Sequence, residues 1–135
     1  MELNIKKQLA VNGIDFFVDS NILIYMLERH PAVSVMSHFS LAVSVISEME
    51  LLGKKGITPH EINTIRSLLN NCEIIDFSNT IKEIAISIKQ RYTVKIPDAI
   101  IIATAKNFGL PLVTADIDLK KILDTDIVIL DLIST

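Results

Sequence analysis

The sequence has a single cysteine, no excess of positive charge and no long hydrophobic run, and each shortage argues against a class of protein. Because Cys72 stands alone among 135 residues, an intrachain disulfide is impossible and a cysteine-based zinc site is not expected. This cysteine usage fits a reducing cytosol. The net charge of −3 predicts no broad basic face for nucleic acid, although the 13 lysine and arginine residues can still form a local basic rim.

The sequence also shows no pattern typical of a membrane span, a leader sequence or a linker. No apolar run approaches the roughly 18 residues that a membrane-spanning helix needs. The opening segment MELNIKKQLAVNG is charged and lacks the long apolar stretch and small-residue cleavage pattern of a signal peptide. No repeat or low-complexity linker divides the chain. We therefore expect one cytoplasmic domain over residues 1–135, with residues 1–12 as an N-terminal extension of unknown role.

Hydrophobic residues make up half of the chain, and they fall into short apolar runs that alternate with helical patterns. Parallel strands need crossover connections, and helices usually supply them. The alternation therefore predicts an α/β fold of three layers, in which a parallel sheet of about five strands carries helices on both faces. The predicted strands are residues 14–18, 41–46, 73–77, 110–114 and 126–130. The predicted helices are residues 21–29, 47–56, 58–71, 79–92, 97–109 and 116–123.

The helix predicted in TPHEINTIRSLLNN has the clearest start signal in the chain. Thr58 fits the N-cap, Pro59 the first helical position, and Glu61 completes a capping box three residues after the cap. The apolar stripe of this helix is formed by Ile62, Ile65, Leu68 and Leu69.

Four acidic residues stand at or near the predicted carboxyl ends of strands. In open parallel sheets, ligands bind beyond these ends, near the point where the strand order reverses. Asp19 directly follows the first strand, and Asp116 follows the fourth strand in LVTAD. Glu50 lies one helical turn after the second strand, and Asp98 opens the helix that leads into the fourth strand. The four carboxylates converge on one rim if the first strand neighbours both the second and the fourth, an order that the residues alone do not establish.

Such carboxylates suggest a metal site. Converging acids repel each other and raise one another's pKa values, and a divalent cation removes this penalty. Magnesium prefers oxygen ligands in octahedral geometry, and paired metals roughly 3.5–4 Å apart can activate water and stabilise the leaving oxygen of a phosphodiester. The candidate catalytic and metal-binding residues are Asp19, Glu50, Asp98 and Asp116.

Each acid also has an ordinary structural explanation. Asp19 and Asp116 can cap the helices that follow them. Glu50 stands three residues after Ser47, which is the spacing of a capping box. Asp98, just inside a helix start, suits the positive end of the helix dipole. Both explanations therefore stay open for each residue.

Four further residues can support such a site. Ser20 and Asn21 either orient Asp19 or bind a phosphate through backbone N–H groups, or they belong to an ordinary helix start. Thr114 either forms a hydrogen bond near the metal or only packs within its strand. Asp118 is either a ligand or a neighbour of the ligands, or it is a solvated first-turn acid.

Three segments of the chain resemble the PIN-domain family, and most of all the VapC-like toxins of bacterial and archaeal toxin–antitoxin systems. These segments are FFVDSNILIYML, LAVSVISEMELL and IPDAIIIATAKNFGLPLVTAD, and the resemblance runs from about residue 14 to residue 130. It implies a five-stranded parallel sheet in the order 3-2-1-4-5. It also implies an endoribonuclease that depends on Mg²⁺ or Mn²⁺, forms a homodimer and is inhibited by a cognate antitoxin whose tail enters the acidic groove.

The resemblance also implies which residues form the family's acidic cluster. Glu48 competes with Glu50 for the glutamate position, but Glu50 stands directly before two leucines, as in the family's EL pattern. Ser20 replaces the family's usual threonine and keeps its hydroxyl. Carried over position by position, the acidic cluster falls on Asp19, Glu50, Asp98 and Asp116.

Two other functions remain as alternatives. In a receiver-type phospho-acceptor module, Asp76 at the end of the third strand would be the acceptor, but the first strand ends in one acid rather than two and no lysine follows the last strand. The other alternative is a catalytically silent PIN-like protein that binds RNA or a partner, and the presence of all four acids argues against it. Lys54 and Lys55 either touch RNA phosphates or are solvated lysines at a helix end.

Overall fold

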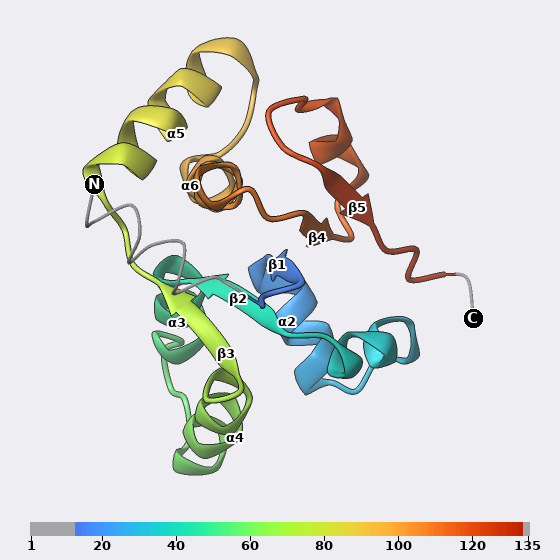
Figure 1. The fold of residues 1–135 in the computed structure, drawn as a ribbon. Coiled ribbons are helices and arrows are strands. Elements are labelled where there is room, and N and C mark those ends of the chain that lie inside the picture. The colour runs from blue at the N-terminus through green and yellow to red at the C-terminus, as the bar shows by residue number, and fades with distance from the viewer. Residues whose placement is uncertain (1–12, 134–135) are drawn as a thin grey trace.

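A computed structural model describes residues 13–133 of the chain, so the predicted N-terminal extension at 1–12 lies outside the described residues. Five strands form one sheet in the order β3-β2-β1-β4-β5, and every neighbouring pair is parallel (Figure 1). This confirms the predicted α/β fold and the strand order implied by the family resemblance. The strands are β1 (Phe16–Val18), β2 (Leu41–Ser44), β3 (Cys72–Ile75), β4 (Leu112–Thr114) and β5 (Ile127–Ile129).

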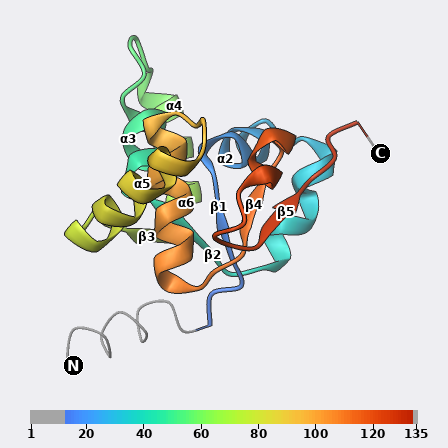
Figure 2. The ribbon, with the colours of Figure 1, turned by 90° about the horizontal axis from the view of Figure 1, so that it is seen from above.

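Helices cover both faces of the sheet, which gives three layers (Figures 1 and 2). One face carries α5 (Asn79–Arg91) and α6 (Ile96–Phe108). The other face carries α2 (Ser20–Leu27), α3 (Val45–Leu52) and α4 (Pro59–Leu69). Two 3₁₀ helices, η1 (Pro31–His38) and η2 (Ile117–Lys121), follow α2 and β4.

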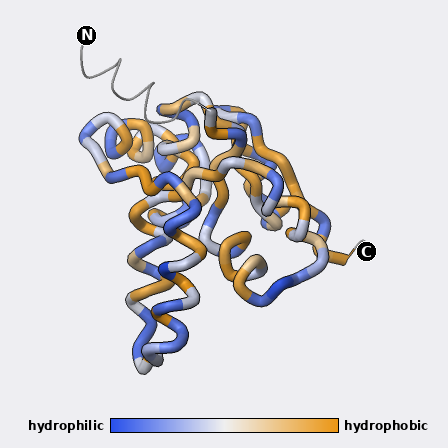
Figure 3. The backbone as a smooth tube through the Cα atoms, turned by 60° about the horizontal axis from the view of Figure 1, so that its bottom comes forward, coloured by the Kyte–Doolittle hydropathy of each residue, from blue (hydrophilic) through white to orange (hydrophobic). Residues whose placement is uncertain are grey.

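The apolar strands supply both halves of the core, because successive strand residues point to opposite faces. Phe17 and Leu112 pack with α5 and α6, whereas the next residues in each strand, Val18 and Val113, pack with α2, α3 and α4. All four are almost fully buried. Along the helices, hydrophobic and hydrophilic segments alternate, as expected for elements with one buried side (Figure 3).

The capping box predicted at residue 58 is present, and the helix predicted at residues 97–109 also ends as expected. Thr58 and Glu61 form the expected capping box at the start of α4. Helix α6 begins at Ile96 and ends before Gly109, which adopts the left-handed conformation that a glycine accepts without strain. Residues 101–105 of α6 are all buried, so this helix lies deep against the sheet.

The second predicted strand was wrong at its end. Strand β2 stops at Ser44, and Val45 and Ile46 begin α3 instead of continuing the strand. The Ser44 hydroxyl accepts a hydrogen bond from the Ile46 amide at 3.0 Å and caps the helix. Valine and isoleucine favour strands in isolation, but here the serine cap and burial against the sheet decide the conformation. The other strands are shorter than predicted, and η1 was not predicted.

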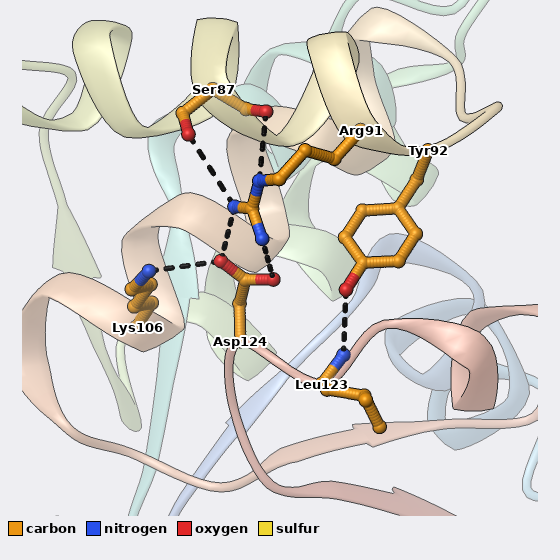
Figure 4. A network of polar contacts seen from close by, with 6 residues as sticks. All are labelled: Ser87, Arg91, Tyr92, Lys106, Leu123 and Asp124. Carbon is orange, nitrogen blue, oxygen red and sulfur yellow. Dashed lines mark hydrogen bonds and ion pairs between the residues drawn. The ribbon is translucent and has the colours of Figure 1, made fainter.

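A charged cluster holds the segment between η2 and β5 against the two helices of one face (Figure 4). The Arg91 guanidinium at the end of α5 donates two hydrogen bonds to the Asp124 carboxylate, and Lys106 of α6 donates a third at 2.9 Å. The Asp124 side chain is only 4% exposed. Alongside this cluster, the Leu123 amide donates to the Tyr92 hydroxyl at 3.3 Å. These contacts fix the segment that follows η2.

Within residues 13–133, we find no helix whose length and apolar character would allow it to cross a membrane.

Candidate functional site

The strand order places the four candidate acids at one edge of the sheet. Strand β1 lies between β2 and β4 and runs parallel to both, so the carboxyl ends of all three meet at the same edge. Asp19 follows β1, and Asp116 lies two residues after β4. Glu50 lies in α3, which begins as β2 ends, and Asp98 lies in the first turn of α6.

The negative charges of these acids act on one another. Burial raises the pKa of Asp19, which is 6% exposed, and the charges of Asp98 and Asp116 raise it further. Burial also raises the pKa of Asp98, to which the charges of Asp116 and Glu50 add, while Lys95 acts in the opposite direction. Four carboxylates from distant parts of the sequence therefore form one electrostatically coupled group.

Asp19 is a helix cap and a member of this group at once. One of its carboxylate oxygens, Oδ1, accepts a hydrogen bond from the Ile22 amide at 3.0 Å, which caps α2. The other, Oδ2, accepts from the Thr114 hydroxyl at 2.5 Å. Both bonds favour the ionised form and so partly offset the effect of burial on the Asp19 pKa. The two explanations of Asp19 are compatible, because the cap uses only one oxygen of the carboxylate.

Thr114 connects the two neighbouring strand ends. It is fully buried, and its hydroxyl donates to Asp19 while accepting a hydrogen bond from the Asp116 amide at 3.1 Å. The hydroxyl therefore does more than pack in the strand: it fixes the positions of two acidic segments relative to each other.

Glu50 does not take part in a capping box, so the proposed pairing with Ser47 as a cap was wrong. Ser44 is the cap of α3, and Ser47 lies in the first turn of the helix, fully buried. The Ser20 hydroxyl donates to Glu50 Oε1 at 2.9 Å and lies 2.8 Å from the Ser47 hydroxyl. Since Ser20 has only one hydroxyl hydrogen, Ser47 must donate to Ser20 when Ser20 donates to Glu50.

This role of Ser47 was missed at the sequence level. The signal that could have found it is a serine at a position of α3 that faces the core, because a buried hydroxyl needs a hydrogen-bond partner.

The remaining candidates lie on the exposed side of the rim. Asp116 Oδ1 accepts from the Asp118 amide at 3.0 Å, so Asp116 caps η2. Asp98, Asp116 and Asp118 share the wall of a groove of about 370 Å³. None of the hydrogen bonds between described residues involves the Asp98 side chain.

Asn21 is exposed in the first turn of α2. Lys54 pairs with Glu61 at 3.1 Å, away from this groove.

The donor set suits a hard cation, but the side chains do not converge closely enough to coordinate one. Carboxylate oxygens are the ligands that Mg²⁺ and Mn²⁺ prefer, and their mutual repulsion is what a cation would relieve. Across residues 13–133, however, no three histidine, cysteine, aspartate or glutamate side chains are grouped so that they could hold a metal as they stand. Asp19 and Glu50 are held by Thr114 and Ser20, whereas none of the hydrogen bonds between described residues holds the Asp98 side chain. Metal binding would therefore require rotation of side chains that are not held, such as Asp98.

The fold and its acidic edge define a PIN-domain protein. The sequence profile of the PIN domain matches residues 16–124, and the chain therefore belongs to the PIN-domain family. This confirms the resemblance seen in the sequence motifs. A comparison with curated proteins finds no significant match.

Several solved structures share the fold. A chain of a toxin–antitoxin complex from Klebsiella pneumoniae is 31% identical, with a TM-score of 0.73, over 84% of this chain and 96% of that one. A chain of VapBC2 from Rickettsia felis, crystallised with a promoter DNA fragment, is 22% identical over 87% of this chain and 100% of that one, with a TM-score of 0.73. A chain of DNA-bound VapBC from Salmonella typhimurium is 20% identical over 85% and 97%, with a TM-score of 0.71.

Proposed function

We propose that this protein is a metal-dependent endoribonuclease and the toxin of a VapC-like toxin–antitoxin pair. The observation that carries the proposal is the placement of Asp19, Glu50, Asp98 and Asp116 at one edge of the sheet, where neighbouring acidic charges help to raise the pKa of Asp19 and of Asp98. Membership of the PIN-domain family and the 31% identity to a chain of a toxin–antitoxin complex support it. The cofactor would be Mg²⁺ or Mn²⁺, held by the four carboxylates.

In such a site, the acids and the residues that hold them would have different roles. When bound, the metal would supply an activated water and a positive charge for the leaving oxygen of the phosphodiester. Asp19 is fixed in place by Ile22 and Thr114, so its carboxylate is pre-oriented. Ser20 orients Glu50 in the same way. Asp98 stands on the groove wall, where an RNA strand can approach it.

The partners follow from the same proposal. The substrate is RNA, and the inhibitor is a cognate antitoxin whose tail would reach the four acids and block access to them. We also propose a homodimer, as the family resemblance implies, that acts in the cytoplasm, as the cysteine usage predicts.

The test is cleavage of RNA by the wild type and by Asp98→Asn. In the presence of Mg²⁺ or Mn²⁺ we expect cleavage by the wild type, its loss on addition of a chelator, and a fall of about 100-fold or more in Asp98→Asn. Asp98→Asn keeps the size of the side chain and disturbs no hydrogen bond between described residues.

Asp76→Asn is the matched control, because Asp76 is an exposed acid just after β3 and takes no part in the coupled group. It should cleave like the wild type. Full activity of Asp98→Asn, or of the wild type in chelator, would remove the metal mechanism.

One alternative function, a PIN-like protein that binds without cleaving, is supported by a specific observation. The lack of a ready metal cluster within residues 13–133 fits a PIN-like protein that binds RNA or a partner without cleaving. RNA binding with no cleavage under any divalent metal would support it. The receiver-type alternative no longer stands, because receiver folds have the strand order 2-1-3-4-5 and the sheet here has the order 3-2-1-4-5.

A further inference from the structure

The groove beside the acids is also lined by three lysines. Lys89 lies near the end of α5, Lys95 is the N-cap residue of α6, and Lys121 ends η2. All three are exposed. Asp98 and Asp116 belong to the same groove wall. Acidic side chains that would attract a metal therefore lie next to cations that would attract a phosphate.

Two of these ammonium groups are already held in place. Lys89 Nζ donates to the Val94 carbonyl at 2.6 Å, and Lys121 Nζ donates to the Thr93 carbonyl at 2.9 Å. Each ammonium has three hydrogens, so each retains two for a ligand. Because these side chains are already ordered by the connection between α5 and α6, a bound anion would restrict them less than it would restrict freely moving lysines.

The third lysine, Lys95, acts electrostatically on one of the acids. The charge of Lys95 acts on Asp98 and opposes the burial that raises the pKa of that carboxyl. None of the hydrogen bonds between described residues involves the Lys95 side chain. Its ammonium is therefore available to a ligand without loss of an existing contact.

The composition of the groove indicates what kind of ligand it recognises. Its apolar members are Val94 and Leu119, and none of the described residues that line it is aromatic. Bases of single-stranded RNA are recognised by stacking on aromatic or arginine side chains, whereas phosphates are bound by cations without regard to sequence. The groove thus has the chemistry for a sugar–phosphate backbone and lacks a platform for a base.

We infer that this groove is a backbone subsite for single-stranded RNA, in which Lys95 and Lys121, with Lys89 beside them, bind phosphates next to the one cleaved at Asp98 and Asp116. The inference rests on the proposed nuclease function, since it places the same substrate beside the same acids. It adds that binding at this subsite is independent of base sequence and depends on salt concentration.

The experiment measures binding of a fluorescent single-stranded RNA oligonucleotide by anisotropy, with the full chain in chelator so that no cleavage occurs. The affinity is recorded at several salt concentrations for the wild type, Lys95→Gln and Lys121→Gln. We expect each substitution to weaken binding about 3- to 10-fold at low salt and to reduce the slope of log affinity against log salt by about 0.7.

Lys120→Gln is the matched control. Lys120 is an exposed lysine of the same 3₁₀ helix, but it does not line the groove. This variant removes the same charge and should leave both affinity and slope within error of the wild type. Because Lys121 also holds the Thr93 carbonyl, Lys121→Arg should restore most of the affinity, and thermal unfolding checks that the variants are folded.

The outcomes separate this inference from the proposed function. Equal behaviour of Lys95→Gln, Lys121→Gln and Lys120→Gln, or a wild type that does not bind RNA, would overturn the subsite. Normal cleavage in Mn²⁺ together with equal lysine variants would leave the nuclease in place without the subsite. RNA binding could depend on Lys95 and Lys121 although no metal supports cleavage. This result would contradict the proposed nuclease activity and would support a site that only binds the RNA backbone.

Discussion

At the scale of single residues, the site depends on hydroxyl groups that hold carboxylates. Thr114 binds Asp19 and the Asp116 amide, and Ser20 binds Glu50 with Ser47 behind it. These hydroxyls fix Asp19 and Glu50, each of which belongs to a group of acids whose negative charges repel.

Thr114→Val tests this arrangement, because valine keeps the shape of the side chain and removes the hydroxyl. It leaves Oδ2 of the buried Asp19 without its donor and removes the side-chain acceptor of the Asp116 amide. We expect the free energy of unfolding to fall by about 1–3 kcal/mol in urea titrations, together with a clear loss of RNA cleavage.

Thr104→Val is the control for this substitution. Thr104 is equally buried, but its hydroxyl donates only to the Ile100 carbonyl within α6. It should lose less stability and keep its cleavage activity. Equal activity in both variants would show that Thr114 has no part in the site.

The residue scale also shows how far the sequence could predict the site. The positions of the four acids after strands and at helix starts pointed to one rim, and the motif resemblance selected Glu50 over Glu48. The interpretation of Glu50 as part of a capping box failed, because Ser44 rather than Ser47 caps α3. Hydrogen bonds such as that from Ser20 to Glu50 join residues far apart in the chain, and no local pattern encodes them.

At the scale of elements, the cluster around Asp124 holds the end of the η2 segment to α5 and α6 (Figure 4). Hydrogen bonds from Arg91, and then from Lys106, hold the pKa of Asp124 at about 2, although the burial of the carboxylate works against them. Its ordinary value is 3.8. The cluster therefore makes a contribution to stability that depends on pH.

We expect Asp124→Asn to lower the free energy of unfolding by roughly 1–2 kcal/mol at pH 7. A carboxyl whose pKa is lower in the folded chain contributes its full stability above the unfolded pKa of about 4, and this contribution is lost as the pH falls toward 2. Urea titrations of the wild type and Asp124→Asn should thus differ at pH 7, approach each other below pH 4 and converge only near pH 2. A difference that stays constant over this range would contradict the assignment.

The elements themselves were mostly predictable from local signals. The alternation of apolar runs with helical patterns predicted five strands, and the box at Thr58 predicted the start of α4. The boundary after β2 was wrong because Val45 and Ile46 have strand propensity but are held in α3 by tertiary packing. The 3₁₀ helix η1 has no comparable periodic pattern, and the sequence therefore did not reveal it.

At the scale of the whole molecule, the strand order turns scattered acids into a site. Phe17 of β1 pairs with Ala42 on one side and with Leu112 on the other, so the strand order reverses at β1, and ligands of open parallel sheets bind near such a point. No residue pattern within the chain specifies this pairing. It was available beforehand only through the resemblance to PIN domains.

The central claim is that these carboxylates are brought together to hold a cation, and calorimetric titration with Mn²⁺ at neutral pH tests it most directly. The account predicts saturable binding to the wild type and to Asp76→Asn, with affinity at least about tenfold weaker in Asp98→Asn, since one ligand and one negative charge are lost. A wild type that shows no saturable binding, or an Asp98→Asn variant that binds as tightly, would contradict it.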